Sequence, residues 1–162
     1  TGNSNSATVN QTAQTQIFAN QSDINQSGNN NIAQVTQFDD EQTSTVNQTS
    51  NNNIATVSQG LSQNGTDTTY NNNSSINQGG GDRNFASVSQ TGIVGESSVN
   101  QNGEDNNASL TQSGVGNNSA IDQTGANQLA NVTQSGSGNV SDVDQAGDGG
   151  NTATVGQAGS NS

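Results

Sequence analysis

The chain contains no proline, cysteine, methionine, tryptophan or histidine, and Arg83 is its one basic residue. Without cysteine it forms no disulfide, so cysteine usage does not indicate a compartment. Because histidine, cysteine and lysine are the usual general bases and nucleophiles, we predict that the protein is not an enzyme and needs no cofactor. The formal net charge of −12 repels phosphate, which excludes nucleic acid as a partner.

Large apolar residues are also scarce. Val, Ile, Leu and Phe make up 25 of 162 residues, roughly 15%, where a charged chain with less than ~20% usually stays disordered. No apolar run is long enough to span a membrane, so we expect no membrane insertion. A polar disordered linker would explain this composition, but it would not explain the regular spacing of the few aliphatic residues.

Thirteen copies of one five-residue phrase fill the chain: a small residue, any residue, an aliphatic residue, any residue, then Gln. Eight of the twelve intervals between these Gln residues are 11 residues and two are 12. The small residue alternates without exception between Ala and Ser, so the structural unit is ~22 residues long. A fixed period of this kind indicates a solenoid, here of about 6.5 units.

Each phrase alternates inward and outward positions with the period of a β-strand. Gly stands two residues after the repeat Gln in nine copies, where it permits a tight turn. Two strands per unit form a β-arch, and arches bury their inner faces by stacking. We predict an all-β fold, a two-sheet parallel β-solenoid of stacked β-arches that forms a cross-β fibril subunit, with identical residues ~4.8 Å apart.

The alternation assigns each inward residue to a sheet. The small residues of one sheet are Ala7, Ala33, Ala55, Ala86, Ala108, Ala130 and Ala153, and those of the facing sheet are Ser22, Ser44, Ser74, Ser97, Ser119 and Ser141. The predicted core aliphatic residues are Val9, Ile24, Val35, Val46, Val57, Ile76, Val88, Val99, Leu110, Ile121, Val132, Val143 and Val155.

Amide side chains recur at two inward positions. A buried amide is costly unless it is paired, and in a ladder each amide donates to one copy and accepts from another. The predicted Gln ladders comprise Gln11, Gln37, Gln59, Gln90, Gln112, Gln134 and Gln157 in one sheet, and Gln26, Gln48, Gln78, Gln101, Gln123 and Gln145 in the other. An Asn ladder is predicted two residues before Ala, at Asn5, Asn31, Asn53, Asn84, Asn106 and Asn151. The corresponding position before Ser is more variable, and we assign no ladder there.

We divide the chain into a short flank at residues 1–4, a solenoid at 5–159 and a tail at 160–162. The two longest intervals between Gln residues are assigned to extra loops at about residues 12–21 and 60–73. Insertions of this kind project from a solenoid without changing its register.

One outward position differs from the polar remainder. The residue before each Ala is large and apolar in four of seven copies, which are Ile32, Ile54, Phe85 and Leu129. An exposed apolar strip usually marks an interaction site, so we predict lateral contacts at these residues. The alternative is that the strand bends here and folds these side chains over the arch.

The phrases Asn-x-Ala-x-Val-x-Gln at residues 53–59 and Ser-x-Val-x-Gln-x-Gly at 97–103 resemble the curlin repeat, and the resemblance extends over about residues 3–159. That family builds curli, the secreted functional amyloid of bacterial biofilms. The resemblance implies an extracellular fibre subunit at the bacterial cell surface, exported through a dedicated pore and started by a nucleator. Two departures are the absence of a Gly-rich secretion segment before the first repeat and the single tyrosine, Tyr70.

Because the repeats run almost from the first residue to the last without a recognisable cap, we expect two open solenoid ends. We therefore predict that the chain is its own partner in a homopolymeric, end-to-end filament for biofilm matrix and adhesion. The alternative is a soluble β-solenoid that binds a surface, as adhesins or ice-binding proteins do, and does not polymerise. The outward residues of this chain vary too much from repeat to repeat to form the regular, lattice-matched face of an ice-binding protein. Its Gly-rich turns resemble calcium-binding β-roll turns too weakly to predict a metal site.

Overall fold

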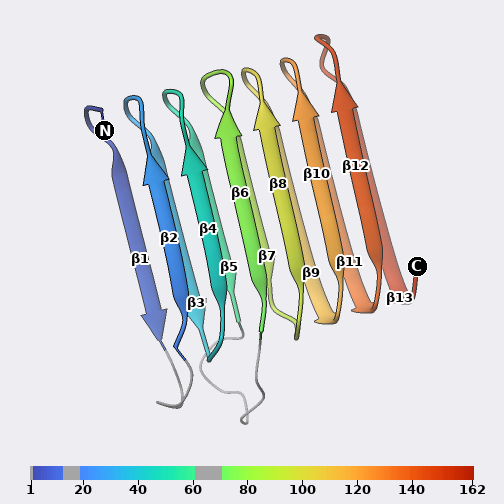
Figure 1. Ribbon diagram of the computed structural model, residues 1–162. Helices are drawn as coiled ribbons and strands as arrows, with labels where there is room; N and C mark the ends of the chain where they lie inside the picture. The colour runs from blue at the N-terminus through green and yellow to red at the C-terminus, as the bar shows by residue number, and fades with distance from the viewer. Residues whose placement is uncertain (1, 13–18, 61–70) are drawn as a thin grey trace.

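Two parallel sheets face each other along the whole molecule in the computed structural model, which describes residues 2–12, 19–60 and 71–162 (Figure 1). The seven-stranded sheet contains β1 (Ser6–Thr12), β3 (Ile32–Phe38), β5 (Ile54–Gln59), β7 (Phe85–Gln90), β9 (Asn107–Val115), β11 (Leu129–Ser137) and β13 (Thr152–Ser160). The six-stranded sheet contains β2 (Gln21–Gln26), β4 (Thr43–Gln48), β6 (Asn73–Gly79), β8 (Glu96–Asn102), β10 (Asn118–Thr124) and β12 (Val140–Ala146).

This architecture confirms the predicted fold class of an all-β, two-sheet parallel solenoid with a repeat of about 22 residues. The chain passes from one sheet to the other at every turn, so odd-numbered and even-numbered strands point in opposite directions (Figure 1). The two extra loops proposed from the sequence lie mostly outside the described residues. None of the described residues forms a helix long and apolar enough to cross a membrane.

The register places each residue beside its counterpart in the next unit. Ala7 is paired with Ala33 and Gln11 with Gln37 in the first two strands of the seven-stranded sheet. Ser119 is paired with Ser141 in the last two strands of the six-stranded sheet. Because every strand repeats the same phrase, each sheet is built from rows of like residues running along the solenoid axis.

The apolar core is a thin layer between the sheets, made of the Ala row and one aliphatic side chain from each inner strand. Val35, Val46 and Ile76 are completely buried. The edge strand departs from the prediction, because Val9 keeps its register with Val35 but is 46% exposed. In the part of the chain that the structure describes, no strand pairs with the outer side of β1, so its inward face remains partly open to solvent.

Turns at both ends of the arches place one residue in the left-handed region of backbone conformation. Between the six-stranded and the seven-stranded sheet this position is held by Asn30, Asn52, Arg83, Asp105, Asn127 and Gly150, with φ between 56° and 70°. Asn, Asp and Gly tolerate this conformation, whereas Arg does so poorly. At the opposite turns the matching residues are Glu41, Val94, Gly116 and Gly138, with Asn161 after β13.

Val94 is the most strained of these residues, since a β-branched side chain at a φ of 55° is a conformational outlier. Its side chain is half exposed, so it gains little from packing. We expect Val94→Gly to raise the free energy of unfolding by roughly 1 kcal/mol, the relief of left-handed strain less the added entropy of glycine. Denaturant unfolding followed by circular dichroism measures this change.

Val140 provides the matched control. It is also exposed, but it begins β12 in extended backbone, where valine is favoured and glycine is not. Val140→Gly should therefore lower the denaturant midpoint. If both variants shift the midpoint in the same direction, strain at Val94 does not govern its contribution to stability.

Candidate functional site

The Gln side chains form two continuous hydrogen-bonded rows between the sheets. In the seven-stranded sheet Gln11 Nε2 donates to Gln37 Oε1 at 2.7 Å, and the row continues through to Gln157 with distances of 2.8–2.9 Å. In the six-stranded sheet the row runs from Gln26 to Gln145 with distances of 2.8–2.9 Å. In both rows every donor points toward higher residue numbers.

From Gln26 onward, the second N–H of each repeat Gln crosses to the opposite sheet. Gln101 Nε2, on β8, donates to the backbone carbonyl of Phe85 on β7 at 2.9 Å. Gln112 Nε2, on β9, donates to the carbonyl of Glu96 on β8, also at 2.9 Å. Repeated in successive units, these contacts cross-link the sheets. Sequence reasoning missed these contacts, because the repeated phrase does not reveal how the two sheets are staggered.

The Asn row does not make the predicted amide-to-amide contacts. Instead, each side-chain Oδ1 accepts from the backbone N–H of the next residue in the row, as when Asn84 N donates to Asn53 Oδ1 at 2.9 Å. The side-chain Nδ2 donates to turn groups: for Asn84 these are Gly81 O at 3.1 Å and Gly103 O at 2.7 Å, and for Asn53 the acceptor is the Ser50 hydroxyl. Asn is one methylene shorter than Gln and stands beside a turn, so backbone groups are its nearest partners.

The members of the Asn row are placed differently according to their position in the solenoid. Asn5 Oδ1 accepts from Asn31 N, and Asn106 Oδ1 accepts from Gln128 N. Asn151 lies at the last turn, is exposed, and donates to Ala146 O at 3.1 Å. Gln128 occupies an Asn position, and its side-chain amide donates to two turn carbonyls in the same way.

A second row of this type lies in the six-stranded sheet, where sequence reasoning assigned none. Asn72 Oδ1 accepts from Gly95 N at 2.8 Å, and Asn117 Oδ1 accepts from Asn139 N at 3.0 Å. The row comprises Asn20, Gln42, Asn72, Gly95, Asn117 and Asn139. Gly95 interrupts it with no side chain, yet its backbone N–H still serves as a donor. The signal that could have predicted this row is that Asn occupies four of its six positions.

The aliphatic and Ser rows complete the interior. The seven aliphatic residues of one sheet and the six of the other keep a common register, but the edge members Ile24 and Val155 are only partly buried and Val9 is 46% exposed. In the Ser row, the hydroxyls of Ser119 and Ser141 are hydrogen-bonded at 2.8 Å. These rows set the narrow spacing that lets a Gln on one sheet reach the backbone of the other.

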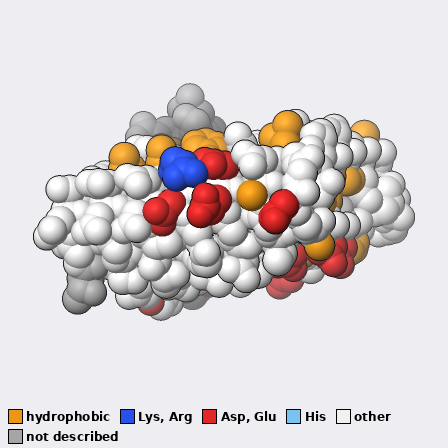
Figure 2. Space-filling model, turned by 90° about the horizontal axis from the view of Figure 1, so that it is seen from above, with side chains coloured by type: hydrophobic (Ala, Val, Ile, Leu, Met, Phe, Trp, Pro, Cys, Tyr) orange, Lys and Arg blue, Asp and Glu red, His pale blue; other side chains and the backbone are white. Residues whose placement is uncertain are grey.

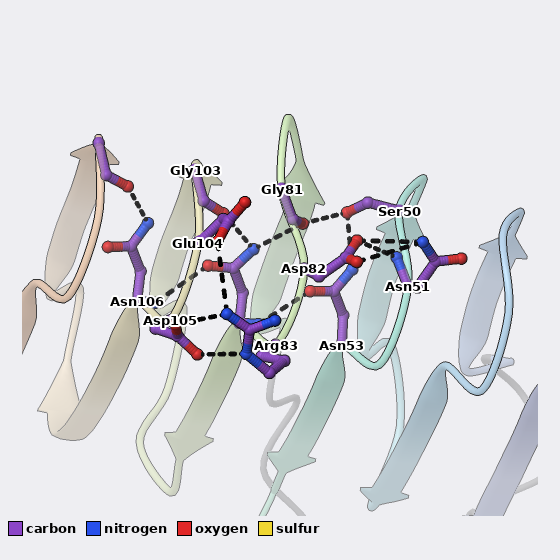
Figure 3. A network of polar contacts seen from close by, with 12 residues as sticks. Ser50, Asn51, Asn53, Gly81, Asp82, Arg83, Gly103, Glu104, Asp105 and Asn106 are labelled. Carbon is purple, nitrogen blue, oxygen red and sulfur yellow. Dashed lines mark hydrogen bonds and ion pairs between the residues drawn. The ribbon is translucent and has the colours of Figure 1, made fainter.

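A polar network connects successive turns around Arg83 (Figure 3). Arg83 donates to both carboxylate oxygens of Asp105 at 2.7 Å and lies 3.3 Å from Glu104. The hydrogen bond from Arg83 lowers the pKa of the Asp105 carboxyl below its ordinary value. Asp82 accepts from the backbone N–H of Asn51 at 2.8 Å. The ion pair is exposed, so it fixes the turn with little effect on stability.

The described residues contain no group of three or more His, Cys, Asp or Glu side chains arranged to hold a metal ion. The sequence-derived ladder residues thus lie together inside the solenoid, where they hydrogen-bond along its axis. This arrangement provides rows of identical side chains along the solenoid axis, and each row ends at the edge strands of its sheet. Strands β1 and β2 form one end, and β12 and β13 form the other.

Comparison with known protein families supports the resemblance to curlin repeats. Residues 103–136, from the turn before β9 to near the end of β11, match the model of the curlin associated repeat. The comparisons with curated proteins and with solved structures found no match.

The inner Gln ladder can be tested with an isosteric substitution. Gln101 donates to Phe85 O and to Gln123 Oε1, and a carboxylate at this position would face both acceptors. We expect Gln101→Glu to lower the free energy of unfolding at pH 7 by about 3 kcal/mol or more. Burial raises the pKa of the introduced carboxyl above the value of about 4.3 that Glu has in the unfolded chain. The loss of unfolding free energy is therefore small below about pH 4.3 and grows as the pH rises above it.

Denaturant midpoints at pH 4 and pH 7 measure this effect. Gln11→Glu is the matched control, because Gln11 is exposed on the edge strand and its one side-chain hydrogen bond to a described residue is to Gln37. The free energy of unfolding of this control should change by less than about 1 kcal/mol at either pH. Equal losses in the two variants would contradict a structural role for the buried ladder.

Proposed function

We propose that the chain is the structural subunit of an extracellular, curli-like functional amyloid fibre that supports bacterial biofilm matrix and adhesion. In this proposal the fibre grows by end-to-end stacking of solenoids. Secretion through a dedicated pore and nucleation at the cell surface belong to the same proposal, and they rest on the resemblance to curlin repeats. The role is structural and requires no cofactor.

The observation that carries the proposal is the complementarity of the two ends. Because ladder donors point toward higher residue numbers, β1 presents the side-chain oxygen of Gln11 and β13 presents an N–H of Gln157. A second copy that placed its β1 on β13 would align Ala7 with Ala153, Val9 with Val155 and Gln11 with Gln157. The donor would then meet an acceptor, and each row would continue into the next molecule.

Stacking would also bury apolar surface that a single chain leaves exposed. Val9 is 46% exposed at one end, and Val155 is partly buried at the other. Their counterparts in the inner strands are buried by neighbours on both sides. The same residues that form the core of one molecule would therefore form the core of the junction, which favours a copy of this chain over an unrelated partner.

Incubating the purified chain in buffer and examining it by electron microscopy tests the proposal. We expect unbranched filaments, fibre diffraction at ~4.8 Å and ~10 Å, and about 31 Å of length for each subunit. A chain that stays monomeric would overturn the proposal and would favour a soluble surface-binding solenoid instead.

An edge substitution should stop growth without unfolding the subunit. Val9→Asp places a carboxylate where a single chain leaves the side chain half exposed but stacking would bury it. We expect dye-detected elongation from preformed seeds to fall by about tenfold or more, since an unpaired buried charge costs several kcal/mol. Thr8→Asp, which adds the same charge on the outward face of the same strand, should elongate normally. Equal inhibition by both would exclude β1 as a stacking surface.

Acidity should control the rate of assembly. Asp23 on β2 and Asp142 on β12 occupy the same outward row, in which the four inner strands carry Thr45, Ser75, Ser98 and Ala120. Stacked copies would bring the two carboxylates within one or two strand spacings, ~5–10 Å, a range comparable to the Debye length of ~8 Å in 0.15 M salt. Lowering the pH from 7 toward the sequence pI of 4.1 protonates carboxylates, so the lag before fibre growth should shorten.

The contribution of the edge pair can be separated from net charge. Asp23→Asn combined with Asp142→Asn should shorten the lag at pH 7 and flatten its pH dependence. Glu96→Gln combined with Asp122→Asn removes two charges from inner strands of the same sheet and should have a smaller effect. A lag that lengthens on acidification would contradict an electrostatic barrier to stacking.

A further inference from the structure

The outward face of the seven-stranded sheet carries no charged residue in any described strand. Its middle rows consist of Ser, Thr, Asn and Gln, such as Thr56 on β5 and Asn131 on β11, apart from Gly156 on β13. This neutrality is unexpected in a chain with a formal net charge of −12. The charges are therefore concentrated elsewhere on the molecule.

The opposite face and the turns hold the charged groups. The outward face of the six-stranded sheet carries Asp23, Glu96, Asp122, Asp142 and Asp144. The described turns carry Asp39, Asp40, Glu41, Asp82, Arg83, Glu104, Asp105 and Asp148. A like-charged neighbour would meet repulsion at these charged surfaces but not at the neutral face.

The predicted lateral residues all lie on this neutral face. Ile32, Ile54 and Phe85 are adjacent in the register of β3, β5 and β7, and they are 46%, 37% and 37% exposed. Leu129 continues the row on β11 beyond Asn107 and is 43% exposed. Figure 2 shows hydrophobic side chains spaced along the upper edge of the view. These side chains point outward, so the alternative in which they fold over the arch does not apply.

We propose that this neutral face is the lateral contact between two copies of the chain that belong to neighbouring filaments. The inference rests on the proposed function, since it needs filaments to act on. The partner is a second copy because the neutral face is the one sheet face that a chain of the same charge can approach without repulsion. Its polar rows and apolar row are also self-complementary, since Ser, Thr and Asn can donate and accept.

The size of the face explains why filaments would associate while monomers would not. Seven strands ~4.8 Å apart and ~20 Å long give about 600 Å² per copy, below the ~800 Å² per partner of a stable interface. A filament repeats the same contact in every subunit, so weak contacts add along its length. Lateral association should therefore follow elongation.

Two isosteric substitutions test the proposal. Asn107 lies in the apolar row of the neutral face and Asn77 lies on the opposite face, and both are exposed. Asn107→Asp should convert bundles into single filaments, with single filaments outnumbering bundles by about tenfold in electron micrographs, because like charges juxtaposed at a contact repel. Asn77→Asp adds the same charge and should leave bundling unchanged. Asn107→Leu, which makes the apolar row continuous from Ile32 to Leu129, should widen the bundles.

Replacing Ile32, Ile54, Phe85 and Leu129 together by Thr removes apolar area while keeping β-propensity. These filaments should elongate at the wild-type rate, measured by dye binding, but should remain single.

Failure to elongate would place the four residues in the core and overturn the lateral proposal alone. Unchanged bundling in the quadruple variant and in Asn107→Asp would also overturn it. If filaments do not bundle but adsorb to a solid surface through the neutral face, the partner of that face is the surface and not a second copy of the chain, and the lateral proposal is wrong. If the wild-type chain forms no filaments, the proposed function fails first.

Discussion

Every inward side chain in this solenoid must be compatible with a copy of itself one strand spacing away. An amide satisfies this constraint because it carries a donor and an acceptor on one group, whereas a carboxylate or an ammonium would face its own charge. Gln therefore fills the buried polar rows, and the carboxylates of the described residues lie in turns and on one outward face. The same constraint explains the Gly residues in the turns, since at Gly136 an added Cβ would lie 1.9 Å from the backbone oxygen of Gly159.

The structure replaces a large apolar core with hydrogen bonds made in three directions. Backbone pairing joins strands within a sheet, the Gln rows run along the axis, and from Gln26 onward the second N–H of each repeat Gln reaches the facing sheet. Gln59 illustrates the third direction by donating to Thr43 O at 2.9 Å. With the amides of the two Gln rows paired in this way, one small and one aliphatic residue per strand are enough to fill the interior. The low content of large apolar residues is thus a consequence of the architecture and does not indicate disorder.

Periodicity alone was sufficient to predict the two sheets, the register and the residues that face inward. It could not predict the partners of Asn53 and its equivalents. These short amides stand at strand starts, where the geometry of the turn decides whether a side chain or a backbone group lies within hydrogen-bonding distance, and the repeat pattern does not show that geometry. It also could not predict the stagger of the sheets or the exposure of Val9, which depend on neighbours in space. The family comparison matches residues 103–136, where the repeat spacing is most regular, while the longer intervals between repeat Gln residues lie nearer the beginning of the chain.

The one-way direction of the Gln rows has an electrical consequence. Amide dipoles that point the same way add together, as peptide dipoles do in a helix, so the solenoid carries a net dipole along its axis. Its positive end lies at β13, where N–H groups face outward, and its negative end lies at β1. Asp122, Asp142 and Asp144 gather near the positive end, where their charge is partly compensated. We therefore expect the two ends of the proposed filament to differ in the rate at which they capture an incoming subunit, which would give the fibre a fast-growing and a slow-growing end.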